Sequence, residues 1–221
     1  MGYADFVREP AEFGAVAAAL SRLSKRGELK RLAKGCYYRP MTGCFGPVPP
    51  SDAAVAAAVG AAPGQPAAYA TGLTVYNALG LTTRVPATLT VATIRPRRRL
   101  PARLRAVVRP ATKQSDDVLL LQWLKLLRNI SHIPDARPDQ VVARIAGELR
   151  GWPAARRRRR LTVLALRQAP PRAWALLGAL LENLSDPAGA AQLRATLSPL
   201  TTYRLGLSTT TLPNRSAWSI R

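Results

Sequence analysis

Apolar positions recur at helical spacing near the start of the chain. Phe13, Val16, Leu20 and Leu23 lie three or four residues apart, so the pattern predicts a helix over residues 10–27 that buries one apolar stripe. The opposite face carries small residues followed by cations, namely Ala15, Ala18, Arg22 and Lys25. That face suits either ordinary contact with water or a close approach to a DNA groove.

A short basic hairpin is predicted directly after this helix. Residues 28–32 and 36–39 read as two strands joined by a turn at residues 33–35. A helix, a glycine and a basic hairpin in this order are typical of a winged helix-turn-helix, in which the helix enters the major groove and the hairpin reaches the flanking backbone. The candidate DNA-binding residues are Arg22, Lys25, Arg26, Lys30, Arg31 and Lys34.

Prolines between Pro40 and Pro50 predict a linker, which divides the chain into a domain over residues 1–45 and a larger one over residues 46–221. In the larger domain, strands are predicted over residues 87–93 and 103–109, and a docked strand over residues 217–220. Periodic segments predict helices over residues 51–61, 72–79, 115–128, 138–149, 153–168, 171–184 and 187–197. The expected fold class is therefore α/β in the broad sense, an α+β chain with a small N-terminal module.

The charge balance is strongly basic. Lys and Arg number 33 against 12 Asp and Glu, which gives a formal net charge of +21, and residues 53–115 contain no acidic residue. Such an excess repels itself unless a polyanion binds it, and nucleic acid is the natural partner. A membrane surface fits less well, because the cations do not gather on one amphipathic helix.

Catalytic and metal-binding chemistry is not expected. The chain has two cysteines, Cys36 and Cys44, and one histidine, His132, which are too few and too far apart for a zinc site. Phosphate-loop and hydrolase motifs are absent, and Asp116 and Asp117 read as the start of a helix. We therefore expect no enzyme activity, no metal and no cofactor. No apolar run is long enough to span a membrane and no signal peptide is evident, so a cytoplasmic protein is expected.

Three stretches of the sequence resemble the AbiEi family of antitoxins from type IV toxin–antitoxin systems. They share the family's order along most of the chain. The first comprises Ala19–Leu23, Gly27 and Arg31–Pro40; the second comprises Tyr69–Leu73, Asn77–Thr83 and Val85-Pro86; the third comprises Leu197–Pro199, Tyr203–Gly206 and Trp218–Ile220. The family's winged helix has a further helix before the segment matching Asp5-Phe6, whereas four residues precede Asp5 in this sequence.

The resemblance implies a winged-helix N-terminal domain and an α/β antitoxin domain. It further implies repression of the protein's own operon through double-stranded DNA with inverted repeats. It also implies antagonism of a nucleotidyltransferase toxin without a stable complex between the two proteins. Two other functions remain open from the residues alone, a general RNA-binding protein and an interaction module that docks on an acidic partner.

Two arginine runs are candidates for a separate antitoxin surface. Arg97, Arg98 and Arg99 lie in a proline-bounded loop, and Arg157, Arg158, Arg159 and Arg160 open a predicted helix. Cations in a first helical turn are opposed by the helix dipole, so a chain that keeps them there is expected to gain from a bound anion. The alternative is that they are surface arginines favoured by a GC-rich genome.

Overall fold

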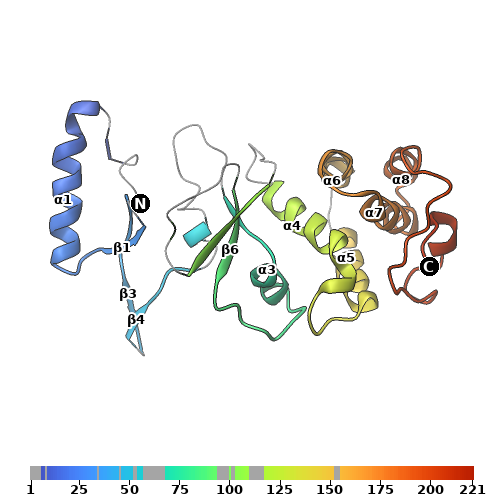
Figure 1. Cartoon of the computed structure of the whole chain (residues 1–221), viewed down its shortest axis with the longest axis horizontal. Helices are drawn as coiled ribbons and strands as arrows, with labels where there is room; N and C mark the ends of the chain where they lie inside the picture. The colour runs from blue at the N-terminus through green and yellow to red at the C-terminus, as the bar shows by residue number, and fades with distance from the viewer. Residues whose placement is uncertain are drawn as a thin grey trace. The chain divides into compact units, whose positions relative to one another are not determined.

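The computed structural model describes residues 6–7, 9–33, 35–44, 46–51, 54–56, 68–93, 100, 103–109, 117–151 and 155–221. It shows a mixture of helices and strands, which confirms the broad α+β class (Figure 1). The chain forms two compact units. The first unit comprises Met1–Thr74 and Pro86–Ser115, and the second comprises Val75–Val85 and Asp116–Arg221.

The first unit begins with a short 3-10 turn, η2 (Pro10–Glu12), and helix α1 (Phe13–Lys25). Gly27 has a φ of +79°, and the chain then turns back as Glu28 and Leu29 donate their N–H groups to the Leu23 carbonyl at 3.1 and 3.2 Å. The left-handed φ explains why glycine follows this helix. The helix predicted over residues 10–27 is thus confirmed with a slightly shorter α-helical part.

The apolar stripe of α1 is only partly buried. Leu20 packs against Leu29 and Tyr37, with Val16 and Leu23 at the edge of this cluster. Phe13 is 50% exposed, so the prediction that it belongs to the buried stripe is wrong. Among the described residues, the cluster that α1 forms with the short β1–β2 hairpin extends no further along the helix than Val16.

Two hairpins follow α1. Strands β1 (Lys30–Ala33) and β2 (Cys36–Tyr38) pair antiparallel, as predicted. Strands β3 (Met41–Gly43) and β4 (Gly46–Val48) form a second antiparallel hairpin in place of the predicted proline-rich linker. Pro47 fits there because a two-stranded ribbon leaves one side of each strand without backbone partners. This second hairpin crosses the boundary predicted after residue 45, and a separate domain over residues 1–45 stays a prediction.

A three-stranded sheet completes the first unit. Strand β6 (Leu89–Thr93) lies between β5 (Tyr69–Ala70), which is antiparallel to it, and β7 (Leu104–Val108), which is parallel. The two longer strands were both predicted. Their buried side chains pack against a helical turn at residues 54–56, where Ser51 Oγ accepts a hydrogen bond from the Ala54 N–H at 3.2 Å. The remainder of the helix predicted to residue 61 lies outside the described residues.

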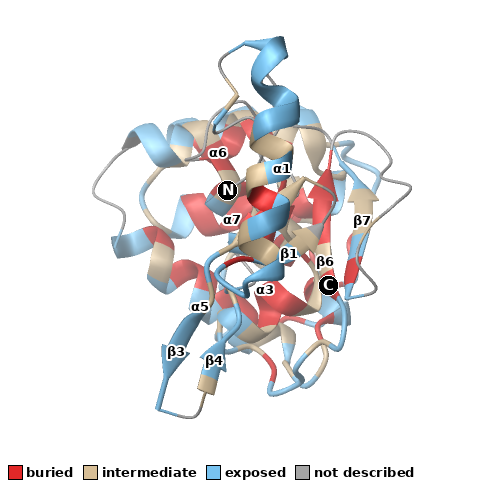
Figure 2. Ribbon diagram, turned by 90° about the vertical axis from the view of Figure 1, so that its left-hand side faces the viewer, coloured by how far each residue is buried: buried red, intermediate tan, exposed pale blue. Residues whose placement is uncertain are grey.

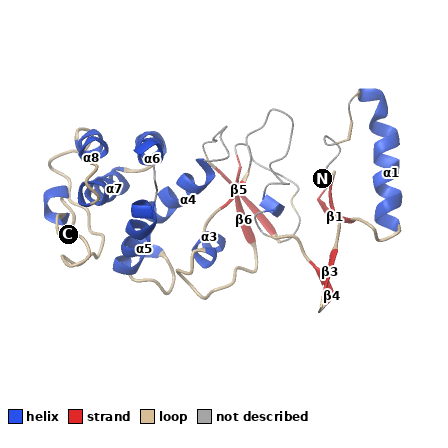
Figure 3. Cartoon of the chain, turned by 180° about the vertical axis from the view of Figure 1, so that it is seen from behind, coloured by secondary structure: helices blue, strands red, loops and turns tan. Residues whose placement is uncertain are grey.

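The second unit is helical. It contains the end of α3 (Leu73–Ala78), α4 (Asp117–Arg128), the 3-10 turn η3 (Ile130–His132), α5 (Pro138–Gly151), α6 (Ala155–Gln168), α7 (Pro171–Asn183) and α8 (Pro187–Arg194) (Figure 3). Each α-helix starts and ends within a few residues of its prediction. The middle of helix α7 is buried and packs against α4, α6 and α8, whereas both ends of the helix are exposed (Figure 2). No helix in the described ranges is both long and apolar enough to cross a membrane.

The C-terminal segment packs against α7. It forms a 3-10 turn, η4 (Arg215–Trp218), and an isolated bridge between Tyr203 and Ile220. The docked strand predicted over residues 217–220 is therefore wrong except at Ile220. The indole of Trp218 lies on Gly178 of α7, where a Cβ atom would overlap its six-membered ring.

Candidate nucleic-acid interface

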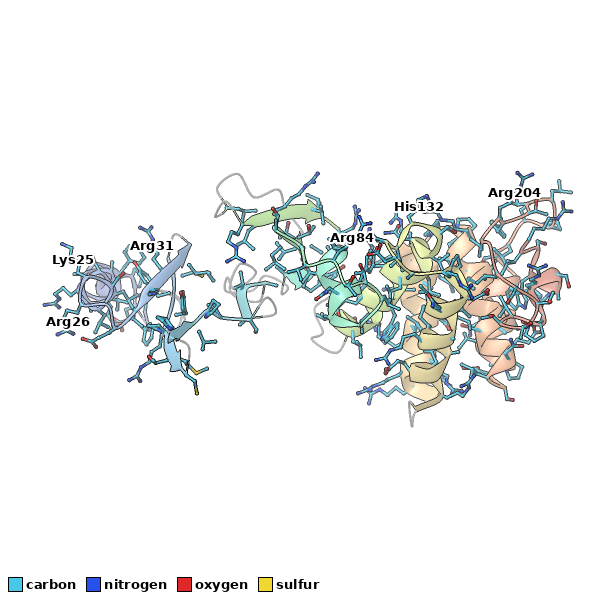
Figure 4. The ribbon with its side chains drawn as sticks, turned by 90° about the horizontal axis from the view of Figure 1, so that it is seen from below. Lys25, Arg26, Arg31, Arg84, His132 and Arg204 are labelled. Atoms are coloured by element: carbon cyan, nitrogen blue, oxygen red, sulfur yellow. The ribbon has the colours of Figure 1, made fainter. Side chains whose placement is uncertain are left out.

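The solvent-facing side of α1 combines small residues with cations. Gly14, Ala15 and Ala18 are exposed and present nothing larger than a methyl group, and Arg22 and Lys25 follow on the same side. Figure 4 shows Lys25 and Arg26 projecting from α1 on the side turned away from β1. A helix with this surface can bring its backbone close to a partner while its cations reach beyond the point of contact.

Two of the three cations at the end of α1 have no acidic partner among the described residues. Arg22 and Lys25 are in this position, whereas Arg26 pairs with Glu28 at 2.8 Å. That pair is exposed on both sides, at 65% and 56%, and such pairs contribute only about 0–1 kcal/mol. Arg26 can therefore exchange Glu28 for a stronger anion at little cost.

The β1–β2 hairpin adds further cations next to α1. Lys30 and Arg31 are exposed on β1, opposite Tyr38 and Tyr37 of β2, and Arg31 is labelled in Figure 4. Arg39, directly after β2, is also exposed and was missed in the sequence analysis. The sequence could have indicated Arg39, because it is the last cation of the basic segment that was predicted to form the hairpin. Lys34, also predicted here, lies outside the described residues.

An apolar groove of about 610 Å³ runs along the other side of α1. It is lined mainly by Val16, Leu20 and Leu23 of the helix, with Phe6, Leu29 and Pro40. The hairpin and this groove occupy the apolar side of α1. The basic side is consequently left for a partner outside the hairpin.

The predicted antitoxin surface is not supported at every arginine. Arg160 donates two hydrogen bonds to Asp117, at 2.8 and 2.6 Å, and Asp117 is only 1% exposed. Arg158 is half-buried and donates to the carbonyls of Leu149 and Leu184 at 3.0 and 3.4 Å. The prediction that these two residues present their charge to a partner is corrected, because their guanidinium groups bind acceptors within the second unit.

The other arginines of the predicted surface on α6 are more exposed than Arg158 and Arg160. Arg157 and Arg159 are exposed, as is the preceding Arg156. Arg97, Arg98 and Arg99 lie outside the described residues. On α6, the residues of the predicted surface that are exposed are therefore Arg157 and Arg159.

Asp117 is buried and paired, which its position in the sequence did not indicate. It lies at the start of α4, as predicted, but its carboxylate is buried against Arg160. Hydrogen bonding to Asp117 raises the pKa of the Arg160 guanidinium. In the described ranges, no three His, Cys, Asp or Glu side chains come together in a way that could hold a metal ion.

A polar cavity of about 500 Å³ lies in the second unit, between residues 79–83 and the start of α5. Asp135 closes one side, where it accepts hydrogen bonds from Thr82 Oγ1 at 2.8 Å and from Arg84 Nε and Nη2 at 3.0 and 3.1 Å. These hydrogen bonds, from Thr82 first and then Arg84, lower the pKa of Asp135. Both carboxylate oxygens of Asp135 thus accept hydrogen bonds, and the cluster links the loop at residues 81–84 to the loop that precedes α5.

His132 is exposed at the end of η3 (Figure 4). Cys36 is half-buried on β2 and Cys44 is exposed, and neither forms a disulfide.

Comparisons with known proteins match the chain to a family model and to a solved structure. A family model with the description "family of unknown function (DUF6088)" matches residues 3–109, a range that includes every predicted DNA-binding residue. The crystal structure of the RV2827C protein from Mycobacterium tuberculosis is similar over 93% of this chain and 79% of that chain, with 18% sequence identity and a TM-score of 0.48. No curated protein matches the chain.

Proposed function

We propose that the protein is a DNA-binding transcriptional repressor that acts in the cytoplasm on its own operon. The observation that carries the proposal is the solvent-facing side of α1, where small residues are followed by Arg22 and Lys25 and then by the cations of the β1–β2 hairpin. In this proposal α1 and the hairpin act as the recognition helix and wing of a winged helix-turn-helix. The protein works by binding, without catalysis, metal or cofactor.

The proposed contacts divide between the groove and the backbone. The small residues Gly14, Ala15 and Ala18 allow α1 to enter the major groove, which admits a helix. Arg22 then lies where it can reach a base edge or a phosphate, and Lys30 and Arg31 bind flanking phosphates. Neutralised phosphates release counterions, so affinity falls steeply with salt.

Duplex DNA fits α1 better than duplex RNA does. The major groove of A-form RNA is deep and narrow, and side chains on a helix cannot read it. The B-form groove accepts a helix whose contact face is built from glycine and alanine. RNA binding is therefore the alternative outcome of the test below.

The test compares ligands and variants in one titration. Labelled duplex DNA from the region upstream of the gene, scrambled duplex and duplex RNA of equal length are titrated with wild-type protein and with a variant carrying Arg22→Ala and Lys25→Ala. We expect preference for the upstream duplex and a loss of at least tenfold, about 1.4 kcal/mol, in the variant.

A matched control removes the same charge from the second unit, at the exposed residues Arg167 and Arg172. Its affinity for the upstream duplex should stay close to that of the wild type. Equal losses in the two double variants, or equal affinity for the duplex RNA, would contradict the proposal.

We further propose that the protein is an antitoxin that counteracts a nucleotidyltransferase toxin without forming a stable complex with it. The resemblance to the AbiEi family supports this part, together with the exposed arginines at the start of α6. Charge reversal of Arg97–Arg99 and, separately, of Arg157 with Arg159 should abolish rescue from the co-expressed toxin, while the binding of a short upstream duplex that α1 and the β1–β2 hairpin alone can cover persists. Rescue retained in both charge reversals would remove this role from these arginines.

A further inference from the structure

The ends of several helices meet at one place in the second unit. The half-buried guanidinium of Arg158, at the start of α6, binds the carbonyl of Leu149 in the last turn of α5 and that of Leu184 at the end of α7. The first turn of α6 therefore lies beside the C-terminal ends of α5 and α7. We call this place the α5–α6 corner and define it by Arg150, Arg156 and Arg159.

All three defining arginines are exposed. Helical side chains lean toward the N-terminus of their helix, so Arg156 and Arg159, one turn apart on α6, extend toward the corner. Arg150 belongs to the last turn of α5, on the other side of the corner. The corner thus carries exposed cations from two helices.

Among the described residues, the acidic side chains at the ends of α5 and α7 and at the start of α8 have partners. Glu148 pairs with Arg144 at 3.2 Å. Glu182 accepts hydrogen bonds from Trp218 and Asn214, and Asp186 accepts one from the Gly189 N–H at 3.1 Å. The positive charge of the corner therefore remains available to an external anion, which the N-terminal end of α6 also favours.

The chemistry of the corner favours a phosphate backbone over a protein partner. The fully buried core of a protein–protein interface is apolar, with large side chains at its centre. None of the exposed large hydrophobic residues in the described ranges lies on α5 or α6. Phosphate binding requires only cations that displace counterions.

We infer that the α5–α6 corner is a second binding surface for the backbone of duplex DNA, separate from α1 and the β1–β2 hairpin. The inference rests on the proposed function for the identity of the duplex. Because the two units belong to one chain, the corner binds phosphates at high effective concentration once α1 has engaged its site. It therefore raises affinity and extends the bound length of DNA without adding sequence specificity.

The experiment uses the full chain and two duplexes, a minimal one of about 12 base pairs and one of about 40 base pairs around the same sequence, a difference of several helical turns. A corner variant carries Arg150→Ala, Arg156→Ala and Arg159→Ala. A matched control carries Arg128→Ala, Arg167→Ala and Arg172→Ala, which removes three exposed arginines with no acidic partner among the described residues. Tryptophan fluorescence verifies that the second unit is folded in each.

We expect the corner variant to lose about tenfold in affinity for the long duplex, and the slope of log affinity against log salt to become shallower by about 3. Its affinity for the minimal duplex should stay at the wild-type value, and the control should bind both duplexes like the wild type. Equal behaviour of the corner and control variants on the long duplex overturns the inference.

The same titrations separate this inference from the proposed function. If Arg22→Ala with Lys25→Ala leaves binding of the minimal duplex unchanged, the role proposed for α1 fails. A corner effect on the long duplex in that case still supports the second surface. Loss of minimal-duplex binding on α1 replacement, without any corner effect, leaves α1 as the interface and refutes the corner.

Discussion

Arg160 holds the carboxylate of Asp117 with two hydrogen bonds across 43 residues of chain. The carboxylate is buried, whereas 36% of the arginine side chain remains exposed. This pair ties the start of α4 to the first turns of α6. One member of a basic run that looks uniform in the sequence is therefore a structural residue.

Replacing Arg160 by Ala should destabilise the second unit by about 3 kcal/mol, because it leaves the buried charge of Asp117 without its partner. The estimate is at the low end for a buried pair, since Arg160 is partly solvated. Urea unfolding followed by tryptophan fluorescence measures the loss. Arg159→Ala, one residue away and exposed, should change the unfolding free energy by less than about 0.5 kcal/mol. Equal effects of the two replacements would mean that the pair contributes nothing.

Gly178 should not tolerate a side chain. A Cβ atom there would overlap Cζ3 and Cη2 of Trp218, and the residues around both are buried. Gly178→Ala is expected to cost about 1–3 kcal/mol, the range for overpacking a core. Gly147→Ala on α5 is the control, because nothing lies within 4 Å of its Cβ position. That change should stabilise the protein by about 0.5–1 kcal/mol through helix propensity. Thermal unfolding that shifts in the same direction for both variants would contradict this account.

Acidification should weaken the second unit through Glu182. Its carboxylate accepts hydrogen bonds from Trp218 Nε1 at 2.7 Å and Asn214 Nδ2 at 2.6 Å, and these, Trp218 first, lower its pKa. A pKa that is lower in the folded than in the unfolded state stabilises the protein at pH above the unfolded value. That stabilisation is lost as the pH falls through the folded value.

Wild type and Glu182→Gln should therefore differ most in unfolding free energy at neutral pH and converge as the pH is lowered below about 4. Urea unfolding followed by circular dichroism, at several pH values, measures this difference. Glu148→Gln removes a carboxylate whose ion-pair partner is the exposed Arg144, so it serves as a comparison. A wild-type advantage over Glu182→Gln that stays constant down to pH 3 would refute the assignment.

Backbone and base contacts of the proposed interface should respond differently to mutation. Replacing both Lys30 and Arg31 by Ala should lower affinity for upstream and scrambled duplex alike and reduce the salt slope by about 2. Arg22→Ala should instead cost about 1–3 kcal/mol on the upstream duplex alone if it reads a base edge. Fluorescence anisotropy at four salt concentrations distinguishes the two patterns. Identical salt slopes in all three proteins would exclude phosphate contacts from the hairpin.

The helices of the second unit could be predicted from the sequence because each has a strong apolar period and a clear boundary residue. Pro171 and Pro187 are examples, as both begin a helix at the predicted residue. Strands β6 and β7 could be predicted from their β-branched content. Local pattern was sufficient in these cases because local preference and tertiary packing agree.

Prediction failed where a distant partner decides the outcome. Pairing of Met41 with Val48 overrides the prolines that indicated a linker. Burial of Trp218 against Gly178 selects a 3-10 turn where the sequence alternates like a strand. Sequence spacing also gave no means of separating Arg160, which faces Asp117, from the exposed Arg159, because the acid lies on another helix.

The burial of Trp123 and Trp218 in the second unit has a practical consequence. All four tryptophans of the chain, at positions 123, 152, 174 and 218, belong to that unit. Intrinsic tryptophan fluorescence therefore monitors the folding of the second unit alone. The first unit, which carries α1, contributes only tyrosine fluorescence. A preparation whose emission spectrum looks native can have a melted α1, so folding of the first unit has to be followed by a probe attached to that unit. The exposed thiol of Cys44, on the hairpin beyond β2, provides a place for that label.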